Sequence, residues 1–191
     1  MALSIPSHYT INVAAVTDFW RKPPSVNSFN APTHLVSINS TEFHRARVTV
    51  SADWTRLYDQ GGLFIYFPES ESTKTKRFWL KSGIEYFHDK PNLSTVASRE
   101  WSDWSLNEIS GKEVTVEVVR EEVDVKNGKG SSLFVYEVVG GVRSEGPVRE
   151  VTWAFEKEGE MKVGVYAARP TAQGEHDHEE LKVTFKDFQL D

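Results

Sequence analysis

Short runs in which apolar and polar residues alternate recur along most of this chain, and this period of two constrains the fold more than any other feature. Residues 78–87 are the clearest example. The apolar positions are Phe78, Leu80, Ile84 and Tyr86, and the positions between them include Trp79, Lys81 and Glu85. Successive side chains of a β-strand point to opposite faces of a sheet. The run therefore predicts one row facing a core and a second row, aromatic and charged, that is a candidate binding surface.

Ten segments of this kind predict strands, and none shows the period of an amphipathic helix. Glycines and the Asn127-Gly128 pair mark the turns between them, and residues 25–32 and 68–76 are expected to be loops. Strands with short connections indicate two antiparallel sheets packed face to face, a sandwich or jelly roll of the all-β class. The predicted strands are residues 9–16, 34–39, 42–54, 63–67, 78–87, 113–123, 133–139, 149–156, 161–168 and 181–190.

Composition narrows the classes of protein to which the chain can belong. A length of 191 residues fits one domain, residues 1–191, that buries a core without disulfides, and the absence of cysteine excludes thiolate metal sites and cysteine nucleophiles. The absence of cysteine, of a basic leader and of a long apolar run predicts a cytoplasmic protein that does not enter a membrane. A net charge of −6 argues against a nucleic-acid partner.

Several motifs resemble those of the DUF1349 family. They are WLKSGIE at 79–85, LSTV at 93–96, SDWS at 102–105, VGVYA at 163–167 before Arg169-Pro170, and the closing segment 181–190. The resemblance covers the chain from about residue 61 onward, and it implies a concanavalin A-like lectin/glucanase sandwich. The family includes a fungal protein named for regulation of enolase, so the resemblance also implies a regulatory role and a glycolytic enzyme as partner. Fold alone does not assign a function.

No cofactor and no metal site are expected. The chain has no phosphate-binding loop, dinucleotide fingerprint or serine nucleophile elbow. The related glucanases use carboxylates in a Glu-x-Asp-x-Glu strand, and Glu175-His176-Asp177-His178-Glu179 has that spelling. We assign these five residues to a solvated loop, because they form a polar run after Pro170 and Gly174. Their histidines and acids could bind a metal only adventitiously.

A face of charged and aromatic residues is the candidate binding site. If residues 95–103 are extended, Arg99, Trp101 and Asp103 share one side and could extend the row of Trp79. Trp rings can stack on a sugar, and guanidinium groups bind carboxylate or phosphate. Residues 102–105 alternatively form a turn, and the charges could be ion pairs within the sheet. The predicted ligand-binding residues are Trp79, Lys81, Glu85, Trp101, Asp103, Arg120, Arg149 and Trp153.

The first functional hypothesis is a non-enzymatic cytosolic binding or regulatory protein whose ligand is small and polar, carbohydrate-like or anionic, or is a protein segment. The alternative is a carbohydrate-active enzyme of the hydrolase or lyase type, with Glu85 and Asp103 as acid and base. A third possibility, protein–protein scaffolding, requires a contiguous apolar patch.

Overall fold

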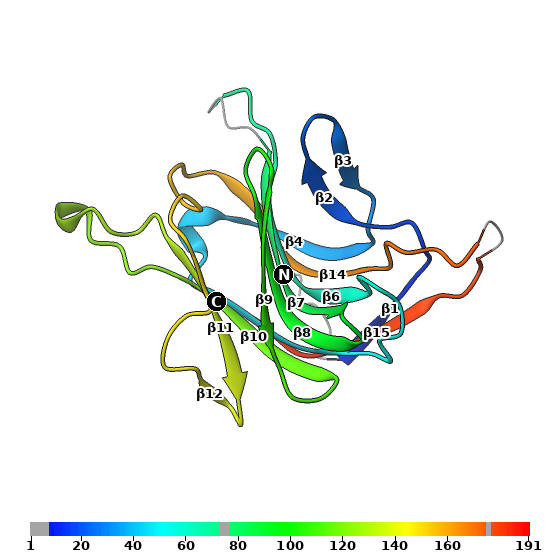
Figure 1. Ribbon diagram of the computed structural model, residues 1–191. Helices are drawn as coiled ribbons and strands as arrows, with labels where there is room; N and C mark the ends of the chain where they lie inside the picture. The colour runs from blue at the N-terminus through cyan, green and yellow to red at the C-terminus, as the bar shows by residue number, and fades with distance from the viewer. Residues whose placement is uncertain (1–7, 73–76, 175–176) are drawn as a thin grey trace.

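The computed structural model describes residues 8–72, 77–174 and 177–191, which form two large antiparallel sheets and one hairpin (Figure 1). The described residues contain two short 3-10 turns, η1 (Ser40–Glu42) and η2 (Val125–Asn127), and no α-helix. In this part of the chain no helix has the length and apolar character needed to cross a membrane. The predicted all-β, two-sheet antiparallel sandwich is confirmed.

The first sheet has seven strands in the order β1-β15-β5-β10-β11-β12, with β13 also paired to β11. Their bounds are β1 (His8–Val13), β5 (Arg45–Ser51), β10 (Glu113–Arg120), β11 (Leu133–Val139), β12 (Val142–Arg143), β13 (Arg149–Val151) and β15 (Leu181–Leu190). Neighbouring strands in this sheet run antiparallel, and the first and last strands of the described chain, β1 and β15, are among these pairs.

The second sheet has six strands in the order β4-β14-β6-β7-β8-β9. Their bounds are β4 (Thr33–Asn39), β6 (Gln60–Phe67), β7 (Phe78–Phe87), β8 (Lys90–Ser98), β9 (Ser102–Glu108) and β14 (Glu160–Ala168). The main core lies between the two sheets, and the predicted apolar row of β7 faces it, with Phe78, Leu80 and Ile84 buried there. The face of the six-stranded sheet that points away from this core is called the outer face below.

A hairpin of β2 (Phe19–Lys22) and β3 (Val26–Phe29) covers part of the outer face and makes a second core. In Figure 1 the tip of this hairpin points away from the two sheets. Phe19 stacks on Phe64 of β6 with 4.2 Å between ring centroids, and Trp79 of β7 is fully buried beside them. The prediction that residues 25–32 form a loop is wrong for Val26–Phe29. These four residues form β3 and pair with β2, and this pairing places the ring of Phe29 against that of Phe19.

Three further predictions on the strands are corrected. Residues 95–103 are not one extended segment, because β8 ends at Ser98 and the chain turns through Arg99, Glu100 and Trp101 before β9. Residues 102–105 are a strand rather than a turn, since β9 pairs along its length with β8. Of the predicted strand 149–156, only Arg149–Val151 is a strand, and turns follow it.

Replacing Gly83 with Ala is expected to destabilise the protein by about 1–3 kcal/mol, as overpacking usually does. Gly83 faces Gly62 across β6 and β7, and a Cβ on Gly83 would lie 2.2 Å from the carbonyl oxygen of Gly61 and 2.5 Å from the Cα of Gly62. Both contacts are with backbone, so the strands would have to separate. Urea denaturation measures the loss. Gly146→Ala is the matched control, since nothing lies within 4 Å of its Cβ, and an equal loss in both variants would contradict this account.

Candidate functional site

A cleft of about 460 Å³ opens on the outer face of the six-stranded sheet beside the hairpin. It is bounded by β2, by the loop before β6, and by β7, β8 and β9, so segments far apart in sequence meet in it. Its size lies within the range usual for small-ligand pockets. The residues that line it are Asp18, Trp20, Lys22, Tyr58, Gln60, Lys81, Glu85, Val96, Trp104 and Pro170.

A buried lysine forms the floor of the cleft. Lys81 is 2% exposed, and its Nζ donates to Asp18 Oδ1 at 3.0 Å and to Gln60 Oε1 at 2.6 Å. Tyr166 is also buried and donates its hydroxyl to the same Gln60 oxygen at 3.3 Å. A buried ammonium is costly unless it is paired. The carboxylate of Asp18, on the segment that leads into the hairpin, supplies that pairing.

Glu85 lies on the same face of β7 as Lys81, four residues further along the strand, and is 5% exposed. Its Oε2 accepts hydrogen bonds from Ser94 Oγ at 2.6 Å and from Trp104 Nε1 at 3.1 Å. Burial raises the pKa of the Glu85 carboxyl above its ordinary value, although Lys81 and these two donors oppose the rise. The two hydrogen bonds hold the Glu85 carboxyl in one position, and its pKa depends on burial and on the charge of Lys81.

Three aromatic side chains line the cleft above this floor. The ring of Trp104 is nearly perpendicular to that of Trp20, with centroids 6.4 Å apart, and it also meets Tyr58 edge to face at 6.3 Å. All three rings are partly exposed. Rings in this arrangement offer flat apolar surfaces to a ligand, while the floor offers hydrogen bonds.

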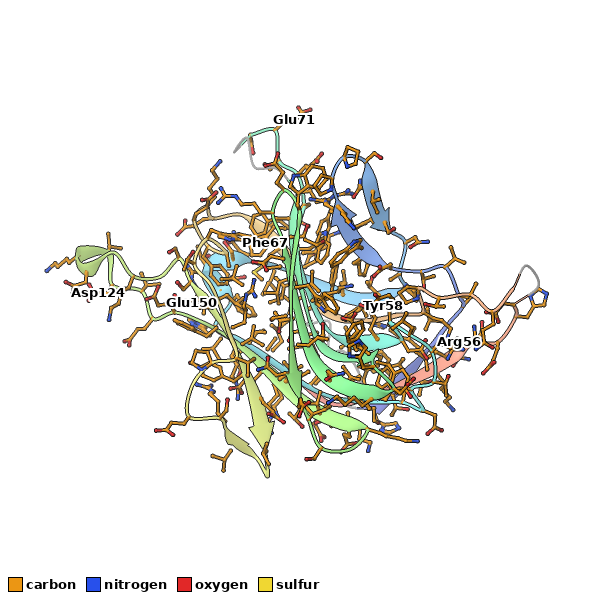
Figure 2. The ribbon with its side chains drawn as sticks, in the orientation of Figure 1. Arg56, Tyr58, Phe67, Glu71, Asp124 and Glu150 are labelled. Atoms are coloured by element: carbon orange, nitrogen blue, oxygen red, sulfur yellow. The ribbon has the colours of Figure 1, made fainter. Side chains whose placement is uncertain are left out.

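The loop that brings Tyr58 into the cleft is held by buried ion pairs. Tyr58 has a φ of 67°, a conformation that a non-glycine residue rarely adopts without support. Next to it, Asp59 is fully buried and accepts from Arg169 Nε at 2.9 Å and from Nη2 at 2.8 Å. Asp59 also accepts from the backbone amides of Thr55 and Arg56. Figure 2 shows Arg56 and Tyr58 on the side of the molecule opposite Asp124.

Three of the eight predicted site residues share the predicted row, namely Trp79, Lys81 and Glu85. Lys81 and Glu85 line the cleft, but Trp79 is fully buried under Phe19 and cannot stack on a ligand in this structure. Its burial was not expected, because residues 25–32, which include β3 of the hairpin that covers it, were predicted to be loop. Trp101 is 42% exposed in the turn between β8 and β9, outside the cleft.

The other predicted residues are not on this row, and the expectation of one shared face is wrong for them. Asp103 pairs with Ala97, a core-facing residue, so its side chain lies on the opposite face of the sheet from Glu85. Asp103 Oδ2 lies 2.5 Å from Arg149 Nη2, an ion pair that joins the edges of the two sheets. The predicted acid–base pair of Glu85 and Asp103 therefore does not flank one groove.

Arg120 and Trp153 also serve packing rather than the cleft. Arg120 belongs to the seven-stranded sheet, donates to the carbonyl of Ser40 at 2.6 Å and lies over the ring of Phe155. Trp153 packs edge to face against Phe78 at the margin of the main core. The ion-pair interpretation left open for this group of charges holds for Asp103 and Arg149.

The Glu-x-Asp-x-Glu run is only partly described, since Glu175 and His176 lie outside the described residues. Asp177 accepts from the guanidinium of Arg56 and from the backbone amide of Gln173, so it anchors its loop. Among the residues that the structure does describe, no group of three or more His, Asp or Glu side chains is placed to hold a metal ion.

Eight of the ten residues that line the cleft were not predicted from the sequence. Trp20 was missed because β2 was not recognised. Trp104 stands within SDWS at 102–105, the segment for which a turn was the alternative prediction. Nothing in the sequence around Gln60, which precedes the Gly61-Gly62 pair, marks it as a site residue. It reaches the cleft because β6 lies beside β7 in the sheet. The residues that were not predicted are Asp18, Trp20, Lys22, Tyr58, Gln60, Val96, Trp104 and Pro170.

Comparisons with known proteins give a consistent family assignment. A family model described as "Protein of unknown function (DUF1349)" matches residues 4–191, which confirms the resemblance and extends it to the N-terminal sixty residues. An uncharacterized protein of Emericella nidulans is 45% identical over 174 residues, with 89% of this chain and 81% of the relative covered. Regulation of enolase protein 1 of Saccharomyces cerevisiae is 26% identical over 188 residues, with 95% and 80% covered.

Solved structures support the fold. A functionally unknown protein from Saccharomyces cerevisiae superimposes with a TM-score of 0.75 at 23% identity, covering 97% of this chain and 88% of that one. A mutant of the GH43 protein BlXynB from Bacillus licheniformis gives a TM-score of 0.60 at 13% identity, covering 98% of this chain and 33% of that one. At such identities the likeness shows the sandwich fold alone.

Proposed function

The chain belongs to the DUF1349 family, and we propose that it is a non-enzymatic binding or regulatory protein that holds a small polar ligand in the cleft. The observation that carries the proposal is the convergence of three aromatic rings on a floor of buried, hydrogen-bonded charges. Small-ligand sites combine apolar walls with a few placed polar groups in this way.

The charges around the cleft favour an uncharged ligand rich in hydroxyl groups. Two acids, Asp18 and Glu85, and two bases, Lys22 and Lys81, line it, so the charges of its described lining balance. A hydroxyl group can donate one hydrogen bond and accept others, so it can bind both the ammonium of Lys81 and the carboxylate of Glu85. The C–H face of a sugar ring can stack on the aromatic walls. A carbohydrate-like ring is therefore the ligand that we propose.

The regulatory part of the proposal concerns a protein partner. The yeast relative is named Regulation of enolase protein 1, and on that name we propose a glycolytic enzyme as the partner of this chain. The chain would act in the cytoplasm as one domain, in keeping with its lack of cysteine. Ligand binding in the cleft would then report the state of carbon metabolism to that partner.

A carbohydrate-active enzyme is the second candidate, because burial raises the pKa of Glu85 as a general acid requires. Its partner carboxylate would be Asp18, which lines the same cleft, in place of Asp103. Turnover of a bound oligosaccharide that is lost in Glu85→Gln would favour this enzyme over the binding protein.

Replacing Trp104 with Ala is expected to remove ligand binding, because the ring lines the cleft and also donates to Glu85. The measurement is a thermal-shift screen against neutral monosaccharides and disaccharides. A sugar at about a hundred times its dissociation constant should stabilise the wild type by roughly 2.7 kcal/mol. Trp101→Ala is the matched control, since Trp101 is exposed outside the cleft. A stabilisation that survives in Trp104→Ala would refute the site.

A further inference from the structure

A second pocket, of about 490 Å³, lies at the tip of the hairpin and is separate from the cleft. The two sites use alternate residues of β2, since Trp20 and Lys22 line the cleft and Arg21 lines this pocket. We call it the arginine pocket, because Arg21, Arg77 and Arg99 line it together with Trp101. Residues 24–27, Glu69 and Glu100 complete its lining.

Two of its guanidinium groups are held in place without being neutralised. Arg21 donates to Asn27 Oδ1 at 3.2 Å and to the carbonyls of Arg77 and Arg99 at 3.1 and 3.4 Å. Arg77 lies over the ring of Phe29, 4.3 Å from its centroid. All of these partners are uncharged. Both arginines are half-buried, so their charges are only partly screened by water.

No described carboxylate lies within ion-pair distance of Arg21 or Arg77, and residues 73–76 are Thr-Lys-Thr-Lys, which contain no acid. The Nε of Arg77 is buried and has no hydrogen-bond partner in the described chain. Six of the other eight arginines form ion pairs with described residues, and Arg47 and Arg120 do not. These six are Arg45, Arg56, Arg99, Arg143, Arg149 and Arg169.

The charges of Arg21 and Arg77 also repel each other. Burial lowers the pKa of Arg21 from its ordinary value, and the neighbouring Arg77 lowers it further. An anion between the two groups would relieve that repulsion and replace lost hydration with hydrogen bonds. Guanidinium groups suit phosphate because they present paired planar donors. A phosphate monoester carries about −1.5 to −2 charge, which matches two cations better than a carboxylate does.

We propose that the arginine pocket binds the phosphate group of a small molecule between Arg21 and Arg77, with the ring of Trp101 covering its organic part. Trp101 is 42% exposed, one of the few large apolar side chains left on the surface. The nearby acid Glu69 raises the pKa of Arg21 by its charge, so it competes with an incoming anion. This site does not depend on the ligand proposed for the cleft.

The test is isothermal titration of the protein with phenyl phosphate and with inorganic phosphate, at constant ionic strength set with chloride. Benzoate, which has the same ring with one negative charge, is the comparison ligand. We expect phenyl phosphate to bind at least tenfold more tightly than benzoate, and Arg21→Gln or Arg77→Gln to weaken it at least tenfold. Arg47→Gln is the control, since Arg47 lies on β5 outside the pocket.

Glu69→Gln keeps the proposal testable if an arginine variant does not fold. Glu69 is exposed, and its neutralisation should strengthen phenyl phosphate binding by about two- to fivefold. Tighter binding of phenyl phosphate than of inorganic phosphate would support the role of Trp101. Absence of binding, or binding unchanged in both arginine variants or in Glu69→Gln, would overturn the proposal.

Discussion

Replacing Arg169 with Met is expected to lower the free energy of unfolding by about 3–5 kcal/mol, among the largest effects of any single substitution in this fold. Arg169 is 1% exposed and Asp59 is fully buried, so the substitution leaves a carboxylate without its cation inside the protein. The same guanidinium also donates to the carbonyl of Glu179 and to the hydroxyl of Thr55. The midpoint and slope of a urea transition, compared with the wild type, measure the loss.

A double variant separates the unpaired charge from the lost packing. Asp59→Asn combined with Arg169→Met removes both charges, and the new amide side chain would keep an oxygen for the backbone amides of Thr55 and Arg56. We expect the double variant to be more stable than Arg169→Met alone, since the buried charge is gone. Lys112→Met, which breaks the exposed pair with Asp53, is the control and should change stability far less. If the double variant were less stable than the single one, the charge account would be incorrect.

The Arg169 variant also tests how the cleft is built. Tyr58 precedes Asp59 and holds a left-handed backbone conformation, which the surrounding bonds must stabilise. Loosening Asp59 should therefore release the Tyr58 ring from its contact with Trp104. We expect ligand binding in the cleft to weaken at temperatures where the variant is still folded. If the variant lost stability but bound ligand as the wild type does, the position of the Tyr58 ring would not depend on Asp59.

The sandwich itself could be predicted from sequence because its signal is local. In β7 the alternation of Phe78, Leu80 and Ile84 with the residues of the other row follows directly from the pleat, and the structure buries that apolar row in the main core. The predicted bounds of β7, β11 and β15 agree with the structure for the same reason. Both strands of the β2–β3 hairpin are only four residues long, too short for a period of two to be recognised.

The candidate site could be predicted only in part, because it depends on contacts between distant segments. Lys81 and Glu85 were found from their shared row, which is a local property. Asp18 and Gln60 complete the charge network from segments 63 and 21 residues away from Lys81, and no local pattern places them there. Trp79 illustrates the converse, since its row was predicted correctly but its burial depended on the hairpin above it.

Replacing Lys81 with Met is the second change with a large expected effect, a loss of about 3–5 kcal/mol at neutral pH. Lys81 is buried and lines the cleft beside Asp18 and Glu85. Of the two described lysines in that lining, it is the buried one. Methionine nearly fills the same volume, so most of the loss should come from the charge. Lys186→Met is the matched control, because Lys186 forms an exposed pair with Glu113 and should contribute less than about 1 kcal/mol.

The effect of Lys81→Met should depend on pH in a direction that the structure fixes. Burial already raises the pKa of Glu85, and Lys81 is the group that opposes the rise most, so the variant should raise that pKa further. A carboxyl whose pKa is higher in the folded than in the unfolded state is destabilising while it is ionised, and this cost disappears as the pH falls through the folded pKa. The stability difference between wild type and variant should therefore be larger at about pH 8 than at about pH 5. Urea transitions at the two pH values decide the matter, and an equal difference at both would show that Glu85 does not feel the charge of Lys81.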